Sequence, residues 1–343
     1  MSNIIRIGVI STARINTLGI LNPCQKRSDI KITAIASKNP QKVQQVAKKY
    51  GIKNIFSNYN DLLYSKYVDA VYISLPNSYH FEFAKRALRA GKHVLCEKPI
   101  VLKVEELAIL KRIAYRKKVF LMDALHYLYY EPLINVMNKL PEYLNTTQPL
   151  KEAIKRVEVF IGFPYPKDNN DIRLNPYLDG GATAHLGCYV THFMTWLFPK
   201  LHWNLYSANK MHLESRVDID SQYVFKMHNN ENLDFSFNVS MNHDKIDSWI
   251  KIYTHQRCVV INHVFTPTSF YDIQNPGKNL LSLEINDMKI ANAITANEEK
   301  TTYDYQLAVF VNGIKNHTRP QVCVPSYEIL EKAHTVGKFH IDK

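Results

Sequence analysis

Two short polar clusters in the first third of this 343-residue chain combine residue types that bind polar ligands. Asn77 and His80 follow the apolar run 71–75, and Glu97 and Lys98 follow the apolar run 93–96. An amide, an imidazole, a carboxylate and an ammonium group together supply hydrogen-bond donors, acceptors and charge. Whether they serve one site depends on the elements that carry them.

The stretch 71–96 predicts a strand, a turn, a helix and a second strand. The run 71–75 is rich in β-formers and ends at Pro76. Apolar residues then recur at helical spacing, and Gly91 is placed to end the helix. The run 93–96 predicts a second buried strand. In an open parallel sheet, ligands bind outside the carboxyl ends of the strands. Both clusters therefore fall where a ligand is expected.

The N-terminal run 4–10 predicts the first strand of a doubly wound sheet. A dinucleotide-binding turn after such a strand needs small residues, so that the backbone approaches the pyrophosphate. The candidates here are Gly8, Ser11, Thr12, Ala13 and Arg14. Ser11 and Ala13 stand where glycines are expected, so the turn fits a cofactor site and also an ordinary strand-to-helix connection.

A second strand is predicted at 30–36, and Ser37 and Lys38 follow it. An acidic residue at this point would bind the adenosine ribose, whereas a hydroxyl and a cation suit a 2′-phosphate. The pair therefore favours NADP(H) over NAD(H). Ser37 or Asn39 can also cap the next helix, with Pro40 at its first position, and the two roles are compatible.

Composition limits the classes of partner. The formal net charge is +12, which favours acidic ligands such as phosphorylated cofactors, although a basic composition also occurs without a dedicated partner. The densest cationic run, 111–118, ends an amphipathic helix, so nucleic acid is not expected. The five cysteines form no CxxC pair, which predicts reduced thiols in a cytoplasmic protein. The N-terminal apolar run is too short to cross a membrane.

Three segments carry a resemblance to a known family. YGIKNIFSNYNDLL (50–63), VDAVYISLPNSYH (68–80) and ALRAGKHVLCEKP (87–99) resemble the Gfo/Idh/MocA family of NAD(P)-dependent oxidoreductases, in its dihydrodiol dehydrogenase and xylose dehydrogenase-like branch. The similarity extends over residues 4–123. It implies a Rossmann dinucleotide-binding domain at 1–124. A substrate-binding and oligomerisation α/β domain is expected at 125–325, and a C-terminal helix at 326–343 that packs back on the body.

The resemblance also implies roles for the first polar clusters. Lys98 would approach both the nicotinamide and the reacting oxygen of the substrate, where an ammonium stabilises developing negative charge. Glu97 would fix Lys98 and balance its charge. The turn at the end of the preceding strand would lie along the dinucleotide, with Leu75, Pro76, Asn77 and His80. For His80 a purely structural place near the start of the helix is an equal alternative.

A second motif, GGATAHLGCY (180–189), resembles the family's Gly-rich pattern before a helix. Tyr189 occupies the position where the family has histidine or tyrosine, which implies transfer of the substrate's hydroxyl proton. The alternative for Tyr189 is core packing. His185 stands where the family has aspartate, so it is expected to orient a substrate hydroxyl, or else the site has moved away from catalysis. His185 and His192 lack the companions of a metal site, and no metal is expected.

The remaining chain predicts the rest of the second domain. Near Leu128, tyrosines replace an arginine of the related branch, so a substrate-contacting cation is missing there. Alternating apolar runs after residue 155 predict a large, mainly antiparallel open sheet. The stretches 303–314 and 327–336 predict closing helices, in which Tyr303 and Gln306 border the cleft or simply pack.

Two functional hypotheses follow. The first is an NADP(H)-dependent oxidoreductase that acts on a hydroxyl or ketone of a carbohydrate-like substrate, which is possibly nucleotide-linked. The second is a dinucleotide-binding regulator or sensor that keeps the fold without the chemistry. In either case a homodimer or homotetramer through the C-terminal sheet is expected, with neither nucleic acid nor membrane as partner.

Overall fold

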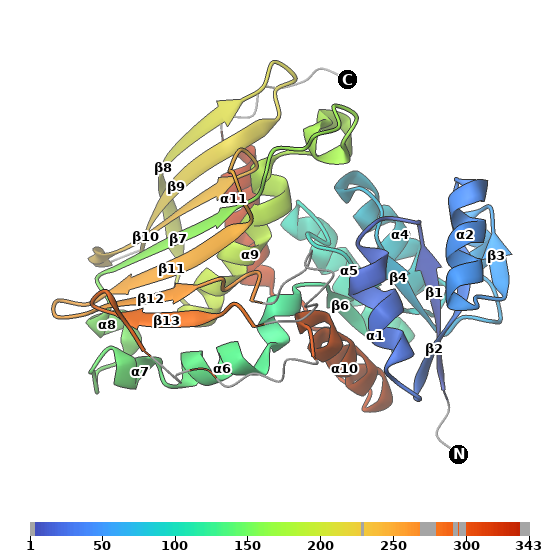
Figure 1. Cartoon of the computed structure of the whole chain (residues 1–343), viewed down its shortest axis with the longest axis horizontal. Coiled ribbons are helices and arrows are strands. Elements are labelled where there is room, and N and C mark those ends of the chain that lie inside the picture. Colours follow the sequence, from blue (N-terminus) through green and yellow to red (C-terminus); the bar gives the residue numbers. More distant parts are fainter. Residues whose placement is uncertain (1–3, 228–229, 268–278, 291–293, 295–299, 337–343) are drawn as a thin grey trace. The chain divides into compact units, whose positions relative to one another are not determined.

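The computed structural model describes residues 4–227, 230–267, 279–290, 294 and 300–336 (Figure 1). The chain divides into two compact units, Met1–His126 with Tyr303–Val324, and Tyr127–Thr302 with Pro325–Lys343. The stretch 303–324, assigned above to the second domain, therefore belongs to the first unit. Phe310 packs on Phe120 with ring centroids 5.8 Å apart, and the backbone N–H of Gln321 donates to the carbonyl oxygen of Leu121.

The first unit contains a six-stranded parallel sheet in the order β3-β2-β1-β4-β5-β6. This is the doubly wound order, whose direction reverses between β1 and β4. All four residues of β4 are buried, as strands covered on both faces require. The strands are β1 (Ile5–Ile10), β2 (Ile30–Ala36), β3 (Asn54–Phe56), β4 (Ala70–Ile73), β5 (His93–Cys96) and β6 (Leu121–Asp123). The predicted fold of this half is confirmed.

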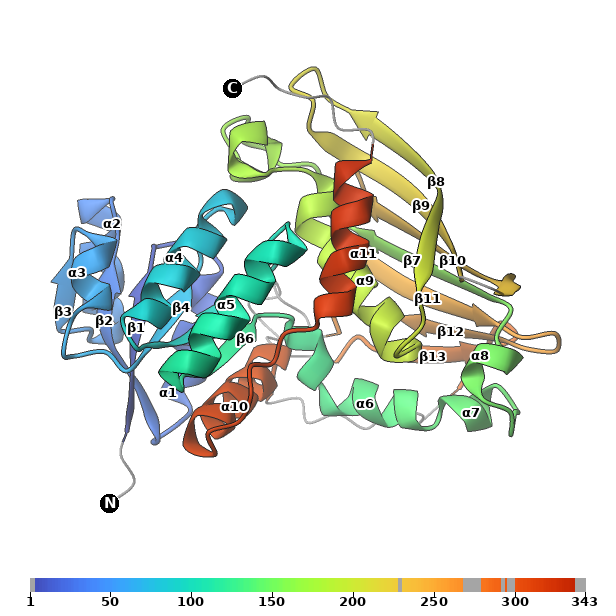
Figure 2. The ribbon, with the colours of Figure 1, turned by 180° about the vertical axis from the view of Figure 1, so that it is seen from behind.

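Helices cover both faces of this sheet. In Figures 1 and 2, α4 and α5 lie on one face and α1 on the other. The side chain of Asn39 accepts the N–H of Lys42 and so caps α2, and Gly91 follows α4 with a φ of 76°. The helices are the π-helix η1 (Thr17–Leu21), α1 (Asn22–Gln25), α2 (Pro40–Tyr50), α3 (Tyr59–Leu63), α4 (Asn77–Arg89), α5 (Val104–Lys117) and α10 (Thr302–Lys315).

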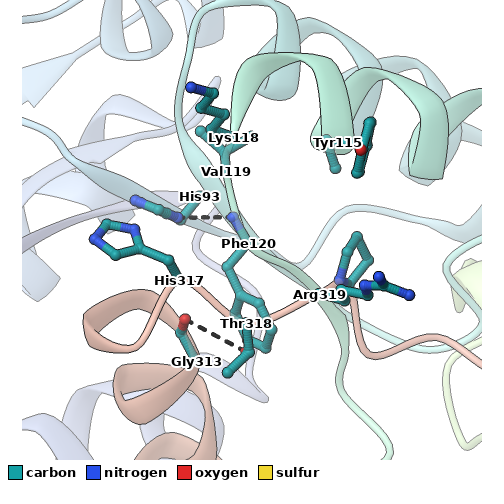
Figure 3. Close-up of a pocket in the computed structure, with 11 residues that line it drawn as sticks. His93, Tyr115, Lys118, Val119, Phe120, Gly313, His317, Thr318 and Arg319 are labelled. Carbon is teal, nitrogen blue, oxygen red and sulfur yellow. Dashed lines mark hydrogen bonds between the residues drawn. The ribbon is translucent and has the colours of Figure 1, made fainter.

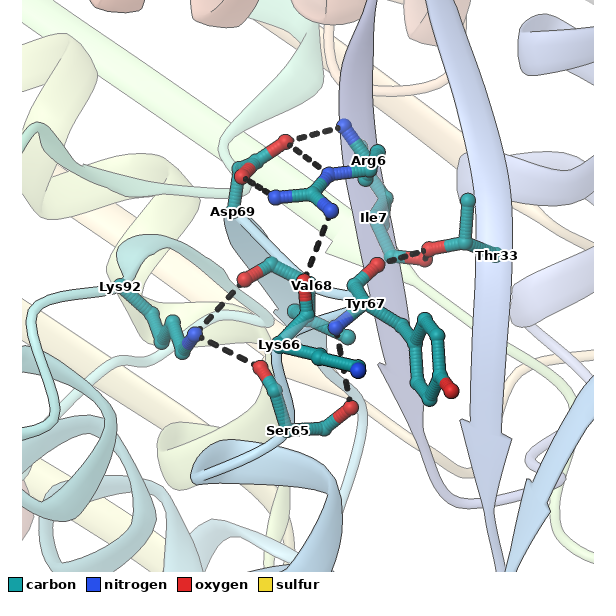
Figure 4. A network of polar contacts seen from close by, with 9 residues as sticks. All are labelled: Arg6, Ile7, Thr33, Ser65, Lys66, Tyr67, Val68, Asp69 and Lys92. Atoms are coloured by element: carbon teal, nitrogen blue, oxygen red, sulfur yellow. Dashed lines mark hydrogen bonds and ion pairs between the residues drawn. The ribbon is translucent and has the colours of Figure 1, made fainter.

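A polar network ties the amino-terminal edge of this sheet together (Figure 4). The guanidinium of Arg6 donates two hydrogen bonds to the carboxylate of Asp69, over 2.9 and 2.6 Å. The ammonium group of Lys92 donates to the carbonyl oxygens of Ser65 and Val68, over 3.0 and 2.7 Å. These contacts join β1 to the segments that lead into β4 and β5, and they leave the opposite, carboxyl-terminal edge to the candidate ligand groups.

The second unit is built on an eight-stranded sheet in the order β14-β13-β12-β11-β7-β10-β9-β8. Among the described strand pairs of this second sheet, only β7–β10 is parallel, which confirms the predicted, mainly antiparallel sheet. The strands are β7 (Arg156–Gly162), β8 (Trp203–His212), β9 (Asp218–Met227), β10 (Asn230–Ser240), β11 (Asp247–Tyr253), β12 (Cys258–Asn262), β13 (Ser282–Ile285) and β14 (Met288–Lys289).

Two helices pack side by side on one face of the large sheet, α9 (Ala182–Leu197) and α11 (Val324–Thr335) (Figure 2). Gly187 makes their close approach possible, because a Cβ there would lie 3.0 Å from a methyl carbon of Leu330. Alternate residues of β11 are buried, as expected for a strand with one packed face. The shorter helices are η2 (His126–Tyr129), α6 (Glu131–Asn138), α7 (Leu140–Tyr143), α8 (Leu150–Ala153), η3 (Ile172–Leu174) and η4 (Pro176–Leu178).

Candidate functional site

The turn after β1 has a glycine-like backbone without a glycine. Ser11 has a φ of 95°, in the region that normally favours glycine. Its hydroxyl oxygen accepts the N–H of Ala13 at 3.1 Å, and its carbonyl accepts the side-chain amide of Asn16 at 2.9 Å. These local bonds hold the strained conformation in place. Ser11 therefore adopts a backbone conformation that normally requires glycine.

Ser37 lies beside this turn at the carboxyl end of β2. Its hydroxyl lies 3.1 Å from the hydroxyl of Thr12, and it also accepts the N–H of Asn39 at 3.1 Å. Lys38, the next residue, is exposed. The structure thus brings together three residues that sequence reasoning assigned to the cofactor, on the β1 and β2 loops. It also shows that Asn39, and not Ser37, provides the helix cap.

Glu97 and Lys98 follow β5 at the same edge of the sheet, and a buried tyrosine holds Glu97. The hydroxyl of Tyr72, on β4, donates to a carboxylate oxygen of Glu97 over 2.5 Å, and the ring is fully buried. Burial raises the pKa of Glu97, while the bond from Tyr72 and the charge of Lys98 act against that rise. Gly19 makes room, because a Cβ there would lie 2.4 Å from the Tyr72 hydroxyl. Sequence reasoning missed Tyr72 and took it as core.

Both ring nitrogens of His80 lie within hydrogen-bond distance of backbone carbonyl oxygens. One ring nitrogen lies 2.7 Å from the carbonyl oxygen of Leu75 and the other lies 2.7 Å from that of Pro99. The ring is 1% exposed. His80 therefore joins the loop after β4 to the loop after β5, which matches the structural alternative more closely than contact with a ligand. Asn77 is also buried, as the first residue of α4.

A further histidine lies beside Lys98. Burial and the charge of Lys98 lower the pKa of His126 to about 3, so its imidazole is neutral at neutral pH. The ring of Tyr303, at the start of α10, packs on it with centroids 4.4 Å apart. Tyr303, predicted to border the cleft or to pack, is thus buried against His126. His126 itself gave no sequence signal, because it stands between strand and helix patterns.

In the second unit, α9 presents His185 and Tyr189 one helical turn apart. Tyr189 is 6% exposed, and its ring lies 5.8 Å from that of Tyr127 and 5.7 Å from that of Phe265. The ring is therefore held rigidly by aromatic neighbours, as both core packing and a positioned phenol require.

The double glycine before α9 permits an unusually tight turn. Gly181 has a φ of 115°, and a Cβ there would overlap the carboxylate of Asp218. That carboxylate accepts the backbone N–H of Thr183 at 2.9 Å and the hydroxyl of Ser221 at 2.8 Å. Asp218 thus satisfies the start of α9 and fixes the direction in which the helix carries His185 and Tyr189.

An ion pair that sequence reasoning missed lies near His185. The guanidinium of Arg173 donates to both carboxylate oxygens of Asp171, over 2.9 and 2.8 Å. Burial raises the pKa of Asp171, but these bonds and the charge of His185 outweigh it, so the pKa is lowered. Arg173 and Asp171 lie on the loop before the double glycine, a polar stretch without a periodic pattern, so no sequence signal pointed to this ion pair.

Comparison with known proteins finds a family match for the first unit. Residues 5–124 match the family model described as an oxidoreductase family with an NAD-binding Rossmann fold, GFO_IDH_MocA. The similarity to the Gfo/Idh/MocA oxidoreductases is thus established for residues 5–124. All the predicted cofactor-binding residues, from Gly8 to Lys98, lie inside the match, whereas His185 and Tyr189 lie outside it.

Two curated relatives are 31% identical to this chain over the residues that match. One is D-xylose 1-dehydrogenase (NADP(+)) 2 of Haloferax volcanii, over 183 residues, 53% of this chain and 54% of the relative. The other is the dTDP-3,4-didehydro-2,6-dideoxy-alpha-D-glucose 3-reductase of Actinomadura kijaniata, over 192 residues, 55% and 54%. The chain thus spans about half the length of the curated relatives it matches.

Among solved structures, KijD10, a 3-ketoreductase from Actinomadura kijaniata in complex with NADP and TDP-benzene, has a TM-score of 0.82 to this chain. Sequence identity is 23%, and the match covers 96% of this chain and 95% of that one. At this identity the likeness establishes the fold of both units. Within the described ranges, no group of three or more His, Cys, Asp or Glu side chains could hold a metal, and no helix has the length and apolar character of a membrane span.

Proposed function

We propose that this protein is an NADP(H)-dependent oxidoreductase that transfers hydride between nicotinamide and a hydroxyl or ketone carbon of a sugar or sugar-like substrate. One observation carries the proposal. A sheet in the order β3-β2-β1-β4-β5-β6 places Lys98 and its partner Glu97 at the carboxyl end of β5, in a segment that matches the oxidoreductase family. In such sheets ligands bind at this edge, next to the point where the strand order reverses.

The proposed residue roles divide the chemistry between the two units. The nicotinamide, when bound, supplies or accepts the hydride. Lys98 stabilises negative charge as it develops on the substrate oxygen, while the Tyr72–Glu97 bond holds Glu97 in place beside Lys98. Tyr189 exchanges the proton of the substrate hydroxyl, and His185 orients a neighbouring hydroxyl. Glu97 and Tyr72 are positioning groups in this scheme.

The cofactor preference follows from the end of β2. The hydroxyl of Ser37 and the cation of Lys38 stand where NAD-binding sheets carry a carboxylate. Relatives that match about half of this chain are named as NADP(+) enzymes, and KijD10 was solved with NADP. These observations support NADP(H) over NAD(H), with the pyrophosphate at the Ser11–Arg14 turn.

The substrate class rests on weaker support than the reaction. Relatives act on D-xylose or on a dTDP-linked ketosugar by name. The net charge of +12 favours an anionic, nucleotide-linked sugar over a free one. The test is nicotinamide absorbance at 340 nm with NADP⁺ and a panel of free aldoses, and with NADPH and dTDP-linked ketosugars. We also propose that the protein forms a homodimer or homotetramer through the large sheet and that it works in the cytoplasm.

One specific observation favours the competing regulator hypothesis: a histidine stands at position 185, where the family has aspartate. It predicts NADPH binding without turnover of any panel member. The bond from Tyr72 that holds Glu97 beside Lys98 favours the enzyme, because a site that only binds the dinucleotide has no need of a positioned carboxylate beside that lysine.

The substitution Ser37→Asp tests the cofactor preference. A carboxylate at this point repels a 2′-phosphate, so NADPH affinity is expected to fall about 10²-fold while NADH affinity stays equal or rises. Nicotinamide fluorescence titrations measure both. The matched control is Ser28→Asp, an exposed position ahead of β2 with the same charge change. An unchanged ratio of the two affinities would remove Ser37 from the cofactor site.

The substitution Tyr72→Phe tests the positioning role. Tyr72 lowers the pKa of Glu97 against the effect of burial, so its loss is expected to raise that pKa further. Glu97 then becomes protonated at a higher pH and no longer balances the positive charge of Lys98. The acidic limb of the kcat/KM profile should therefore move up by about one to two pH units, the equivalent of one hydrogen bond to a charge. Tyr79→Phe, on an exposed ring, is the control; superimposable profiles for wild type and Tyr72→Phe would refute the role.

A further inference from the structure

A cavity of about 530 Å³ lies inside the first unit, at the edge of the sheet opposite Glu97 and Lys98 (Figure 3). The starts of β5 and β6, the end of α5 and the chain that leaves α10 surround it. Its lining residues are His93, Ala114, Tyr115, Lys118, Val119, Phe120, Gly313, His317, Thr318, Arg319 and Pro320. Because it meets the amino ends of the strands, it is separate from the proposed dinucleotide site.

The inner wall of the cavity is apolar and shaped by a glycine. The buried ring of Phe120 lies against α10 at Gly313, where a Cβ would come within 2.4 Å of ring carbons. Val119 and Ala114 continue this wall and are also buried. Small-molecule sites typically have volumes of roughly 300–1,000 Å³ with mainly apolar walls and a few polar groups. The cavity fits this description.

His93 supplies a hydrogen-bond donor of fixed tautomer. Its Nδ1 atom accepts the backbone N–H of Phe120 at 2.8 Å, so the proton of the neutral imidazole sits on Nε2 (Figure 3). Burial lowers the pKa of His93 to about 4, although the carboxylate of Asp69 opposes this, and the nearby His317 acts in the same direction as burial. At neutral pH the ring is therefore an uncharged N–H donor in the wall of the cavity.

The charge of the cavity has one sign. None of the eleven lining residues is acidic, while Lys118 and Arg319 are permanent cations. Neither of these two forms an ion pair with any residue in the described part of the chain. Lys118 ends α5 with a φ of 55°, and Arg319 lies on the loop after α10, so they approach the rim from separate elements. A hollow with low-dielectric walls concentrates such a positive field.

We propose that this cavity binds a small organic anion, with an aromatic or aliphatic body against Phe120 and a phosphate or carboxylate at the rim paired with Arg319 or Lys118. The apolar wall selects the body, and the cations select the charged end. The Nε2–H of His93 donates to an oxygen of the ligand. The proposal is independent of the redox function, because it rests on a different edge of the sheet.

Calorimetric titration of the whole protein with phenyl phosphate tests the proposal, alone and with NADPH in excess. One saturable site is expected in both titrations. The double variant Lys118→Gln/Arg319→Gln should weaken it about tenfold or more, as expected for the loss of charge-assisted hydrogen bonds. Arg116→Gln/Lys117→Gln is the matched control, since both residues are exposed on α5 outside the lining and remove the same charge.

Further titrants identify the ligand class. Benzoate should bind at the same site, and inorganic phosphate should bind at least tenfold more weakly than phenyl phosphate, because it leaves the apolar wall unused. Three results would each overturn the proposal: no saturable binding of phenyl phosphate or benzoate, loss of binding when NADPH is present, or equal weakening by both double variants. Circular dichroism of each variant verifies that it is folded.

Discussion

Replacement of Lys98 by alanine is expected to lower kcat about 10²–10³-fold, the usual effect of removing one group that stabilises an oxyanion. The ammonium lies at the carboxyl end of β5 beside Glu97, which the buried Tyr72 holds. The negative charge that it meets forms during hydride transfer, so the loss belongs to the chemical step. The affinity for NADPH should change only a few-fold. Steady-state kinetics and a fluorescence titration measure the two quantities separately.

Lys103→Ala is the matched control for Lys98→Ala. It removes the same type of side chain, a lysine, five residues downstream. That lysine is exposed and precedes α5. Its kcat should equal that of the wild type. If Lys98→Ala turns over an identified substrate as fast as this control, Lys98 has no part in the chemistry and the proposed mechanism is wrong. If instead NADPH binding is lost with activity, Lys98 serves the cofactor.

The second large effect is expected for Tyr189→Phe, which should lower kcat about 10²–10⁴-fold, as loss of a general acid–base does. The substitution removes one hydroxyl and keeps the ring, so the contacts with Tyr127 and Phe265 persist. Thermal stability should therefore remain close to that of the wild type. Kinetics at several pH values, together with a melting curve, separate a catalytic phenol from a packed ring.

Tyr177→Phe provides the control, because this tyrosine of the same unit is 79% exposed. Unchanged kcat in Tyr189→Phe with a lowered melting temperature would assign Tyr189 to core packing. The proton would then need another donor, and His185, one turn earlier on α9, would be the next candidate.

The strands near the ligand edge were predictable because their signals are local. The runs 30–36 and 93–96 match β2 and β5 at both ends, since each is a short apolar run between polar or glycine-containing turns. The helix after β1 was less predictable. It begins only at Thr17 and has π geometry, and Gly19 within it is shaped by contact with Tyr72, which lies 53 positions later in the chain.

The residues that sequence reasoning missed act through long-range contacts. Tyr72 looks like one more buried strand residue until its hydroxyl is seen to reach Glu97. Arg173 and its partner Asp171 lie in a polar loop with no periodic pattern, and only the fold brings Asp171 near His185. The glycine rule for the first turn was misleading for a related reason, because hydrogen bonds from neighbouring segments hold Ser11 in the conformation of a glycine.

The central claim is that the first unit is an NADP(H) site, and direct titration of the purified protein tests it. NADPH and NADH are added separately, and nicotinamide fluorescence is followed to saturation. The account predicts one tight site per chain for NADPH and clearly weaker binding of NADH, because Ser37 and Lys38 follow β2 where a carboxylate would otherwise bind the ribose. Binding of neither nucleotide would contradict the account, whatever the fold.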